Sequence, residues 1–179
     1  VMAFKNNKLY GEVYETELVH HKALGITPKY GAPFSSYYSA GGELGLTDGL
    51  EGSINFRDGR WQGYSSNDVD VILDLGEIKE IESVHAGFYQ YNNAWVFFPK
   101  LIDVEISING KDWETFGENK PTVLPEARGS LLTTIGVAKT TKTKTRYIRF
   151  MAKNIGVVPN WHEAAGSDAW IFIDEIIVR

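Results

Sequence analysis

The sequence contains no cysteine, and this absence excludes disulfide bonds, thiolate metal sites and cysteine nucleophiles. Basic side chains are also few, with 18 Lys and Arg against 23 Asp and Glu and a formal net charge of -5. Because no basic block stands out, we expect no nucleic-acid partner and no anionic-membrane partner. No apolar run approaches the roughly 18 to 20 residues of a membrane span, so we expect no membrane insertion.

Motifs of common enzyme classes are missing as well. The four histidines are His20, His21, His85 and His162, and none has the H-E-x-x-H spacing of a zinc site. The sequence has no G-x-S-x-G elbow and no G-x-x-x-x-G-K-[ST] phosphate loop. Carboxylates are numerous enough for a glycosidase pair, but those nearest the aromatic residues lie in turns, where Asp has a structural role. The sequence therefore favours a non-catalytic domain over a stand-alone glycosidase.

The chain has 179 residues, enough for one domain with a sizeable core. It shows no internal repeat and no long linker. The N-terminal stretch, "VMAFKNNKLYGEVYETEL", lacks the basic-then-apolar pattern of a signal peptide and begins in polar, strand-like sequence. We therefore expect the chain to be a piece of a longer precursor.

Alternation of apolar and polar residues predicts half-buried strands in "DVDVILDLG" (residues 68–76) and "LIDVEISING" (residues 101–110). Asn109-Gly110 is a two-residue hairpin signal. Further strand-like runs are "KLYGEVYETELV" (8–19), "IESVHAGFYQY" (81–91), "GSLLTTIGVAK" (129–139), "TRYIRFMAKN" (145–154) and "AWIFIDEIIVR" (169–179). The run "KTTKTKT" (139–145) indicates a solvated loop. About eight strands separated by turn residues predict an all-β sandwich or barrel.

A glycine-punctuated turn, "LTDGLEGS" (residues 46–53), is the first candidate site. Asp48 and Ser53 flank its glycines, and Ca²⁺ prefers such hard oxygen ligands mixed with backbone carbonyls. Most Asp-Gly turns bind nothing, so this signal is weak alone.

Two adjacent acids near the C-terminus strengthen the metal hypothesis. Asp174 and Glu175 lie in a strongly apolar run, where a strand would send their side chains to opposite faces. A buried carboxylate needs a partner. That partner is either a cation or an arginine such as Arg146 or Arg149.

The second candidate site is aromatic. Three loop-like segments each carry an aromatic residue beside amide, acid or imidazole groups, as sugar binding by stacking and hydrogen bonding requires. The candidate ligand-binding residues are Trp61, Gln62, Tyr64, Tyr91, Asn92, Asn160, Trp161 and His162. We expect the loops bearing Trp61 and Trp161 to converge at one end of the sandwich. The alternative is that both tryptophans seal that end, or contact a catalytic domain. We expect Trp95 and Trp170 to belong to the core.

A family resemblance joins these segments. "LTDGLEGS", "WQGY", "VDVILDLGEIKEIESV", "VEISINGKDWE", "TRYIRFMAKN" and "AWIFIDEI" occur in order within residues 37–179. Together they resemble the coagulation factor 5/8 type C (discoidin-like) domain and, within it, the family 32 carbohydrate-binding modules. "HKALG", "FRDGRWQGY" and "PNWHEAAGSDAWIFIDEI" resemble modules at the C-terminal end of bacterial family 20 β-N-acetylhexosaminidases.

The resemblance implies an all-β, antiparallel, jelly-roll-like β-sandwich of about eight strands over residues 37–179. Residues 1–36 would be a lead-in from a preceding domain, packed on the module. The resemblance also implies a structural calcium. Its ligands would be the Asp48 and Glu175 carboxylates, the Ser53 hydroxyl and carbonyl, and the backbone carbonyls of Gly45, Leu50 and Asp174. Leu50 stands where an Asn or Asp is often found, which removes one side-chain ligand.

The function that the resemblance implies is non-catalytic. We expect a carbohydrate-binding module of a larger glycoside hydrolase that binds terminal galactose or N-acetylhexosamine glycans. Its partners would be the glycan and the catalytic domain of the same polypeptide, and we expect a monomer located outside the cytoplasm. The alternative function is a structural module that packs on the catalytic domain of a β-hexosaminidase and binds no sugar.

Overall fold

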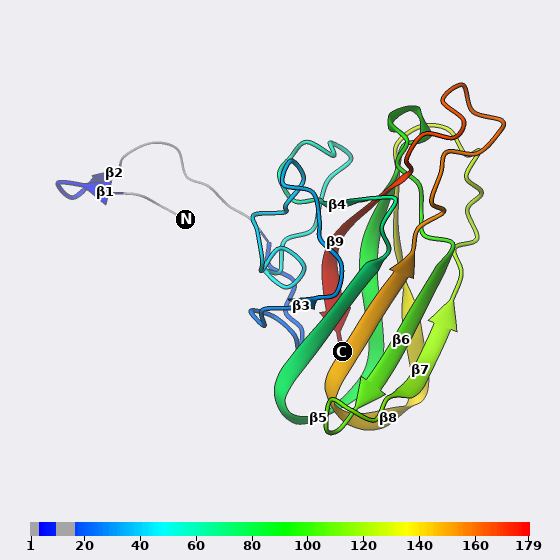
Figure 1. The fold of residues 1–179 in the computed structure, drawn as a ribbon. Helices are drawn as coiled ribbons and strands as arrows, with labels where there is room; N and C mark the ends of the chain where they lie inside the picture. The colour runs from blue at the N-terminus through cyan, green and yellow to red at the C-terminus, as the bar shows by residue number, and fades with distance from the viewer. Residues whose placement is uncertain (1–3, 10–16) are drawn as a thin grey trace.

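The computed structural model describes residues 4–9 and 17–179, and this part of the chain is almost entirely β-structure. The elements are β1 (Phe4–Lys5), β2 (Lys8–Leu9), β3 (Lys29–Tyr30), β4 (Gln62–Ser65), β5 (Val69–Gln90), the 3-10 helix η1 (Asn92–Ala94), β6 (Leu101–Ser107), β7 (Glu114–Asn119), β8 (Leu131–Lys153) and β9 (Trp170–Val178). β1 and β2 form a two-stranded hairpin. The other seven strands form one antiparallel sheet in the order β4-β9-β5-β8-β6-β7, with β3 paired to β5 (Figure 1).

β5 and β8 are 22 and 23 residues long and belong to both layers of the fold. They pair along residues 69–74 with 147–152, and again along residues 83–90 with 131–138, with register shifts between the two stretches. Both strands bend at the lower end of the molecule in Figure 1, so the sheet folds over on itself as a sandwich. The four strands expected in these regions are therefore two continuous strands.

The prediction of a loop at residues 139–145 is wrong, because this run lies inside β8. Its side chains are mostly exposed, as expected of a solvated segment. Threonine favours extended backbone, since its branched side chain packs well on a pleated surface. Alternating Thr and Lys can therefore continue a strand that faces water.

The core confirms the period-two patterns. In β5 the alternating residues Val69, Val71, Leu73 and Leu75 are buried, while the intervening positions are only partly buried. Ile102, Val104 and Ile106 of β6 are buried in the same cluster. The predicted fold class, an all-β antiparallel sandwich, is confirmed, with seven strands in the sheet rather than about eight.

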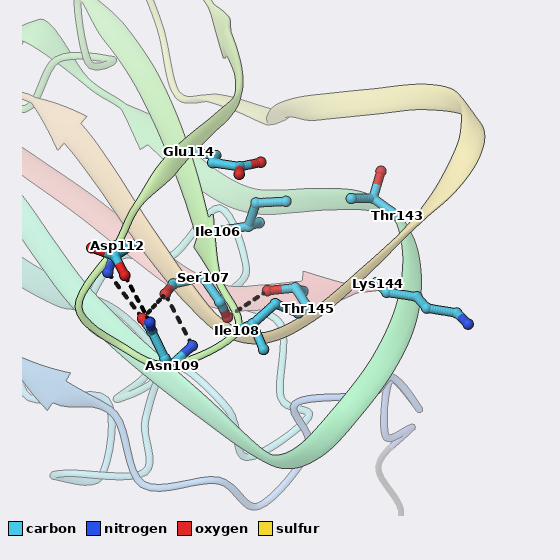
Figure 2. A pocket seen from close by; sticks show the side chains of 9 residues that line it. All are labelled: Ile106, Ser107, Ile108, Asn109, Asp112, Glu114, Thr143, Lys144 and Thr145. Atoms are coloured by element: carbon cyan, nitrogen blue, oxygen red, sulfur yellow. Dashed lines mark hydrogen bonds between the residues drawn. The ribbon is translucent and has the colours of Figure 1, made fainter.

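The β6–β7 connection corrects the two-residue hairpin prediction, because it runs from residue 108 to 113. The Asn109 side-chain oxygen accepts hydrogen bonds from the Lys111 and Asp112 amides, both at 2.9 Å. Figure 2 shows Asn109 bonded to Asp112 and to Ser107 in this turn. The Ser107 hydroxyl accepts from the Gly110 amide at 2.9 Å, and Gly110 has a φ of 70°. Asn109 and Gly110 do mark the turn, but these side-chain hydrogen bonds widen it. The small pocket of about 170 Å³ beside it has no aromatic lining.

Residues 17–36 contribute to the seven-stranded sheet through β3 and through backbone hydrogen bonds. β3 pairs with β5, and the Lys22 amide donates to the Val178 carbonyl at 2.9 Å. Of the strand predicted at residues 8–19, Lys8–Leu9 form β2, and residues 10–16 lie outside the described residues. The domain boundary between residues 36 and 37 stays a prediction. Among the residues that the structure describes, no helix is long and apolar enough to cross a membrane.

Candidate functional site

Three loops at the upper end of the sandwich surround a surface cleft of about 730 Å³. They connect β5 to β6, β7 to β8, and β8 to β9, and Figure 1 shows them clustered at the end opposite the β6–β7 turn. The lining residues are Tyr91, Asn92, Asn93, Glu126, Arg128, Gly129, Trp161, His162 and Glu163. Four of the eight predicted ligand-binding residues are therefore brought together: Tyr91, Asn92, Trp161 and His162.

Trp161 presents the largest aromatic surface in this cleft. Its side chain is 45% exposed, and its ring lies 6.3 Å from that of Phe97 in an edge arrangement. Phe97 is buried with Val158 and Ala169. The loop closes through the Val158 backbone, which donates to the Ser167 carbonyl at 2.8 Å. The exposed indole is thus supported by the small hydrophobic cluster of Phe97, Val158 and Ala169.

His162 has a defined tautomer because its Nδ1 accepts a hydrogen bond from the Ala164 amide at 3.0 Å. In the neutral imidazole the proton is therefore on Nε2, which is a hydrogen-bond donor. The imidazole lies 5.6 Å from the Trp161 ring. Stacking surface and polar donor are adjacent in the sequence and in space.

Two adjacent asparagines in the connection between β5 and β6 have different roles. Asn92 is buried, and its amide nitrogen donates to the Pro125 and Ala127 carbonyls, each at 3.3 Å. Its amide nitrogen therefore holds the neighbouring loop, although the residue borders the cleft. Asn93 is exposed and also lines the cleft. Asn93 is the amide available to a ligand, and the sequence analysis missed it.

Trp61, Gln62 and Tyr64, which the sequence predicts as ligand-binding residues, are buried and do not line this cleft. Trp61 is 2% exposed, and its Nε1 donates to the Ser53 carbonyl at 3.0 Å. Gln62 and Tyr64 are fully buried, and the Tyr64 hydroxyl donates to the Gln62 side chain at 2.7 Å. Burial raises the pKa of Tyr64 above its ordinary value. Trp61 itself therefore offers almost no ring surface beside Trp161.

Strand pairing accounts for the burial of Gln62 and Tyr64. Residues 62–65 form β4, which pairs with the buried strand β9, and polar neighbours in sequence gave no sign of that pairing. Asn160 is exposed but is not among the residues that line the cleft. Three charged cleft residues, Glu126, Arg128 and Glu163, were also missed, since nothing in their local sequence distinguishes them from ordinary surface charges.

The two acids of β9 lie at a β-bulge opposite a glycine. Ala86 pairs with Ile176 and Phe88 with Ile173, so Asp174 and Glu175 together oppose Gly87. A bulge re-aims side chains. Both carboxylates are consequently buried.

The Asp174 carboxylate holds the candidate metal-binding turn of residues 46–53. It accepts hydrogen bonds from the Gly52 amide at 2.8 Å and from the Glu175 amide. Burial raises the pKa of Asp174 to about 7, and these two amides oppose the shift. A β-carbon on Gly87 would lie 2.2 Å from its Oδ1, so the glycine makes room for this carboxylate.

Glu175 pairs with a histidine rather than an arginine. Its Oε1 lies 2.6 Å from Nε2 of His21, while Arg146 and Arg149 pair with Asp74 and Asp70. The Ala23 amide donates to Nδ1 of His21 at 3.3 Å, so Nε2 carries the proton and donates to Glu175. Burial raises the pKa of Glu175, and the hydrogen bond from His21 opposes the shift.

The other oxygen of Glu175, Oε2, is buried without a hydrogen-bond partner among the described residues. Asp48 acts on Glu175 as a neighbouring negative charge, and burial raises the pKa of Asp48 as well. An orphaned carboxylate oxygen beside a second carboxylate fits a hard cation. Ser53 fits less well, since its carbonyl accepts from Trp61 and its hydroxyl from the Asn55 amide at 3.1 Å. In the described part of the chain no three His, Cys, Asp or Glu side chains cluster as metal ligands, so backbone carbonyls would have to complete the site.

Comparison with known families agrees with this fold. The model of the F5/8 type C domain matches residues 32–167. The chain therefore belongs to the F5/8 type C domain family. A search of curated protein sequences finds no match.

Solved structures with this fold include carbohydrate-binding modules. CpGH89CBM32-5 from Clostridium perfringens, in complex with GalNAc-β-1,3-galactose, is 16% identical with a TM-score of 0.52, covering 86% of this chain and 94% of that one. A fucose binding module of Streptococcus pneumoniae is 13% identical with a TM-score of 0.52, covering 90% and 98%. SpGH29 is 16% identical with a TM-score of 0.55, and the match covers 89% of this chain but only 27% of the SpGH29 chain. At these identities the likeness shows the fold alone.

Proposed function

We propose that this protein is a non-catalytic carbohydrate-binding module of a larger glycoside hydrolase and that the upper cleft is its sugar site. The observation that carries the proposal is the half-exposed Trp161, braced by Phe97 in a cleft that also holds an imidazole and an amide. An indole stacks on the apolar face of a pyranose, and His162 and Asn93 offer hydrogen bonds to its hydroxyls. A cleft of about 730 Å³ lies within the range of small-ligand sites.

The ligand class that we propose is a terminal galactose, N-acetylgalactosamine or N-acetylglucosamine residue. The sequence resemblance to family 32 modules supports it, as does a structural neighbour solved with GalNAc-β-1,3-galactose. The polar groups that line the cleft are of mixed charge, from Arg128, Glu126 and Glu163. Neutral sugars with several hydroxyls suit such a mixture of donors and acceptors.

The test is calorimetric titration with the methyl glycosides of these three sugars. We expect a dissociation constant in the millimolar to high-micromolar range, about -4 to -6 kcal/mol. Trp161→Ala should abolish binding without lowering the melting temperature. Trp95→Ala is the matched control, because Trp95 is also exposed but does not line the cleft. If none of the three sugars binds the parent protein, the structural-module alternative replaces this proposal.

The parent enzyme that we propose is a bacterial β-N-acetylhexosaminidase acting outside the cytoplasm, with this module as a monomeric unit beside the catalytic domain. The support is the sequence resemblance of "HKALG", "FRDGRWQGY" and "PNWHEAAGSDAWIFIDEI" to modules of family 20 enzymes. Several of the structural neighbours are modules of glycoside hydrolases, including one from a family 31 enzyme of Clostridium perfringens.

We also propose a structural calcium ion held by Glu175 and Asp48. The buried, unpartnered Oε2 of Glu175 supports this proposal. Backbone carbonyls of Gly45, Leu50 and Asp174 remain the candidate further ligands. When bound, the ion would neutralise two carboxylates whose burial is otherwise costly.

A further inference from the structure

A second hollow lies on the sandwich next to the cleft. It has a volume of about 310 Å³ and lies between the loops of residues 37–40 and 56–61. Its lining includes Tyr37, Tyr38, Ala40, Phe56, Arg57 and Trp61. Four of these six side chains are aromatic. Tyr37 is 91% exposed, so its ring stands almost free in solvent.

The floor of this hollow is firmly packed. The Tyr38 ring lies 4.6 Å from that of Phe172, and the Phe56 ring lies 5.9 Å from it. Phe172 is buried in a cluster with Trp61 and other core aromatics. One wall also contains Ala40 with a φ of 48°, a conformation that residues other than glycine seldom adopt. Packing on Phe172 therefore holds the Tyr38 and Phe56 rings of the hollow in place.

Arg57 is the charged side chain of this hollow. Its guanidinium lies over the Phe56 ring, 5.2 Å from the centroid. Within residues 4–9 and 17–179 it has no salt bridge to a carboxylate. The adjacent Asp58 accepts hydrogen bonds from the Ser53 and Arg60 amides at 2.7 and 2.9 Å. The Asp58 carboxylate is thus engaged by backbone amides. Arg57 presents a positive charge that no carboxylate pairs among the described residues.

The hollow and the cleft have a common aromatic wall. Phe56 lines the hollow and Tyr91 lines the cleft, and their ring centroids are 6.4 Å apart. One oligosaccharide could therefore contact both, with adjacent sugar residues in the two depressions.

We propose that this hollow is a second subsite that takes a carboxylate-bearing sugar, a hexuronate residue. Aromatic walls accept the apolar face of a pyranose ring. A planar guanidinium binds a carboxylate with two parallel hydrogen bonds, and stacking on Phe56 holds it in that orientation. The ligand of the protein then includes an acidic sugar. The inference rests on the proposed function only in that both sites bind carbohydrate.

The test compares methyl glucuronide with methyl glucoside, and methyl galacturonide with methyl galactoside, by calorimetry or NMR titration. We expect at least one uronide to bind about tenfold more tightly than its neutral counterpart, as hydrogen bonds to a charged group imply. Arg57→Gln should abolish this preference, and added salt should weaken it. Lys142→Gln is the matched control, because it removes an exposed positive charge from the middle of β8 and should leave the preference intact.

Several results would overturn the proposal. These are equal binding of uronide and neutral sugar, a uronide preference that survives Arg57→Gln, and tighter binding of galactose 6-sulfate than of either uronide. Trp161→Ala separates the two sites, since it should remove neutral-sugar binding in the cleft and leave uronide binding in the hollow unchanged. Arg57 is exposed, so unchanged melting of Arg57→Gln is expected and makes a loss of binding interpretable.

Discussion

Replacing Trp61 with alanine should unfold the protein at a markedly lower temperature. Trp61 is 2% exposed, its ring packs 5.5 Å from that of Tyr89, and its Nε1 donates to the Ser53 carbonyl. Large-to-small changes of buried tryptophan cost about 3 to 5 kcal/mol, and the lost hydrogen bond is part of that cost. For a domain of this size, about 1 kcal/mol corresponds to about 2 to 4 °C, so we expect a drop of about 6 to 20 °C.

Thermal unfolding followed by circular dichroism measures this effect, with urea unfolding to give the free energy. Trp161→Ala is the matched variant, because it removes the same side chain from a half-exposed position and should change stability by less than about 1 kcal/mol. Trp61→Phe keeps part of the ring contact and should fall between the two. If Trp61→Ala melted with the parent protein but lost sugar binding, the assignment of Trp61 to the core would be refuted.

Three other perturbations test separate parts of the fold. Arg149 lowers the pKa of Asp70 through paired hydrogen bonds, at 2.9 Å each. Because the pKa of Asp70 is lower in the folded state, its ionised carboxylate stabilises the fold above about pH 4, and this stabilisation is lost as the pH falls. Asp70→Asn should therefore lower the free energy of unfolding by about 1 kcal/mol at neutral pH and by less in acid. Gly87→Ala should destabilise by about 1 to 3 kcal/mol, since its β-carbon would meet the buried Asp174 carboxylate; an unchanged urea midpoint would contradict this. A chelator should lower the melting temperature if the proposed calcium is bound, and added Ca²⁺ should restore it.

The sequence could predict strands better than it could predict their continuity. The alternation in residues 68–76 and 101–110 fixed which side chains of β5 and β6 are buried, because period two is a local property. That β5 and β8 each run through a bend as one strand depends on pairing between residues up to 83 positions apart, such as Val69 with Ala152 at one end. No local pattern carries that information.

In the candidate site, too, the sequence predicted local features but not those that depend on the fold. Aromatics in loops could be recognised by composition, and Tyr91, Trp161 and His162 do line one cleft. Burial was not readable, because Trp61 and Trp161 have equally polar neighbours in the sequence and only one of them faces solvent. The hollow bearing Arg57 was missed for a related reason: its walls come from two segments that only the fold brings together.

By itself, the sequence determined the absence of cysteine chemistry, the all-β class and the resemblance that leads to the F5/8 type C family. These follow from composition, short-range periodicity and motif order, which need no third dimension. Only the tertiary structure decided that His21 is the partner of Glu175, 154 positions away, in place of an arginine. The physical reason is that a buried carboxylate takes whichever donor the fold places beside it, and that placement is a property of the packed sheet.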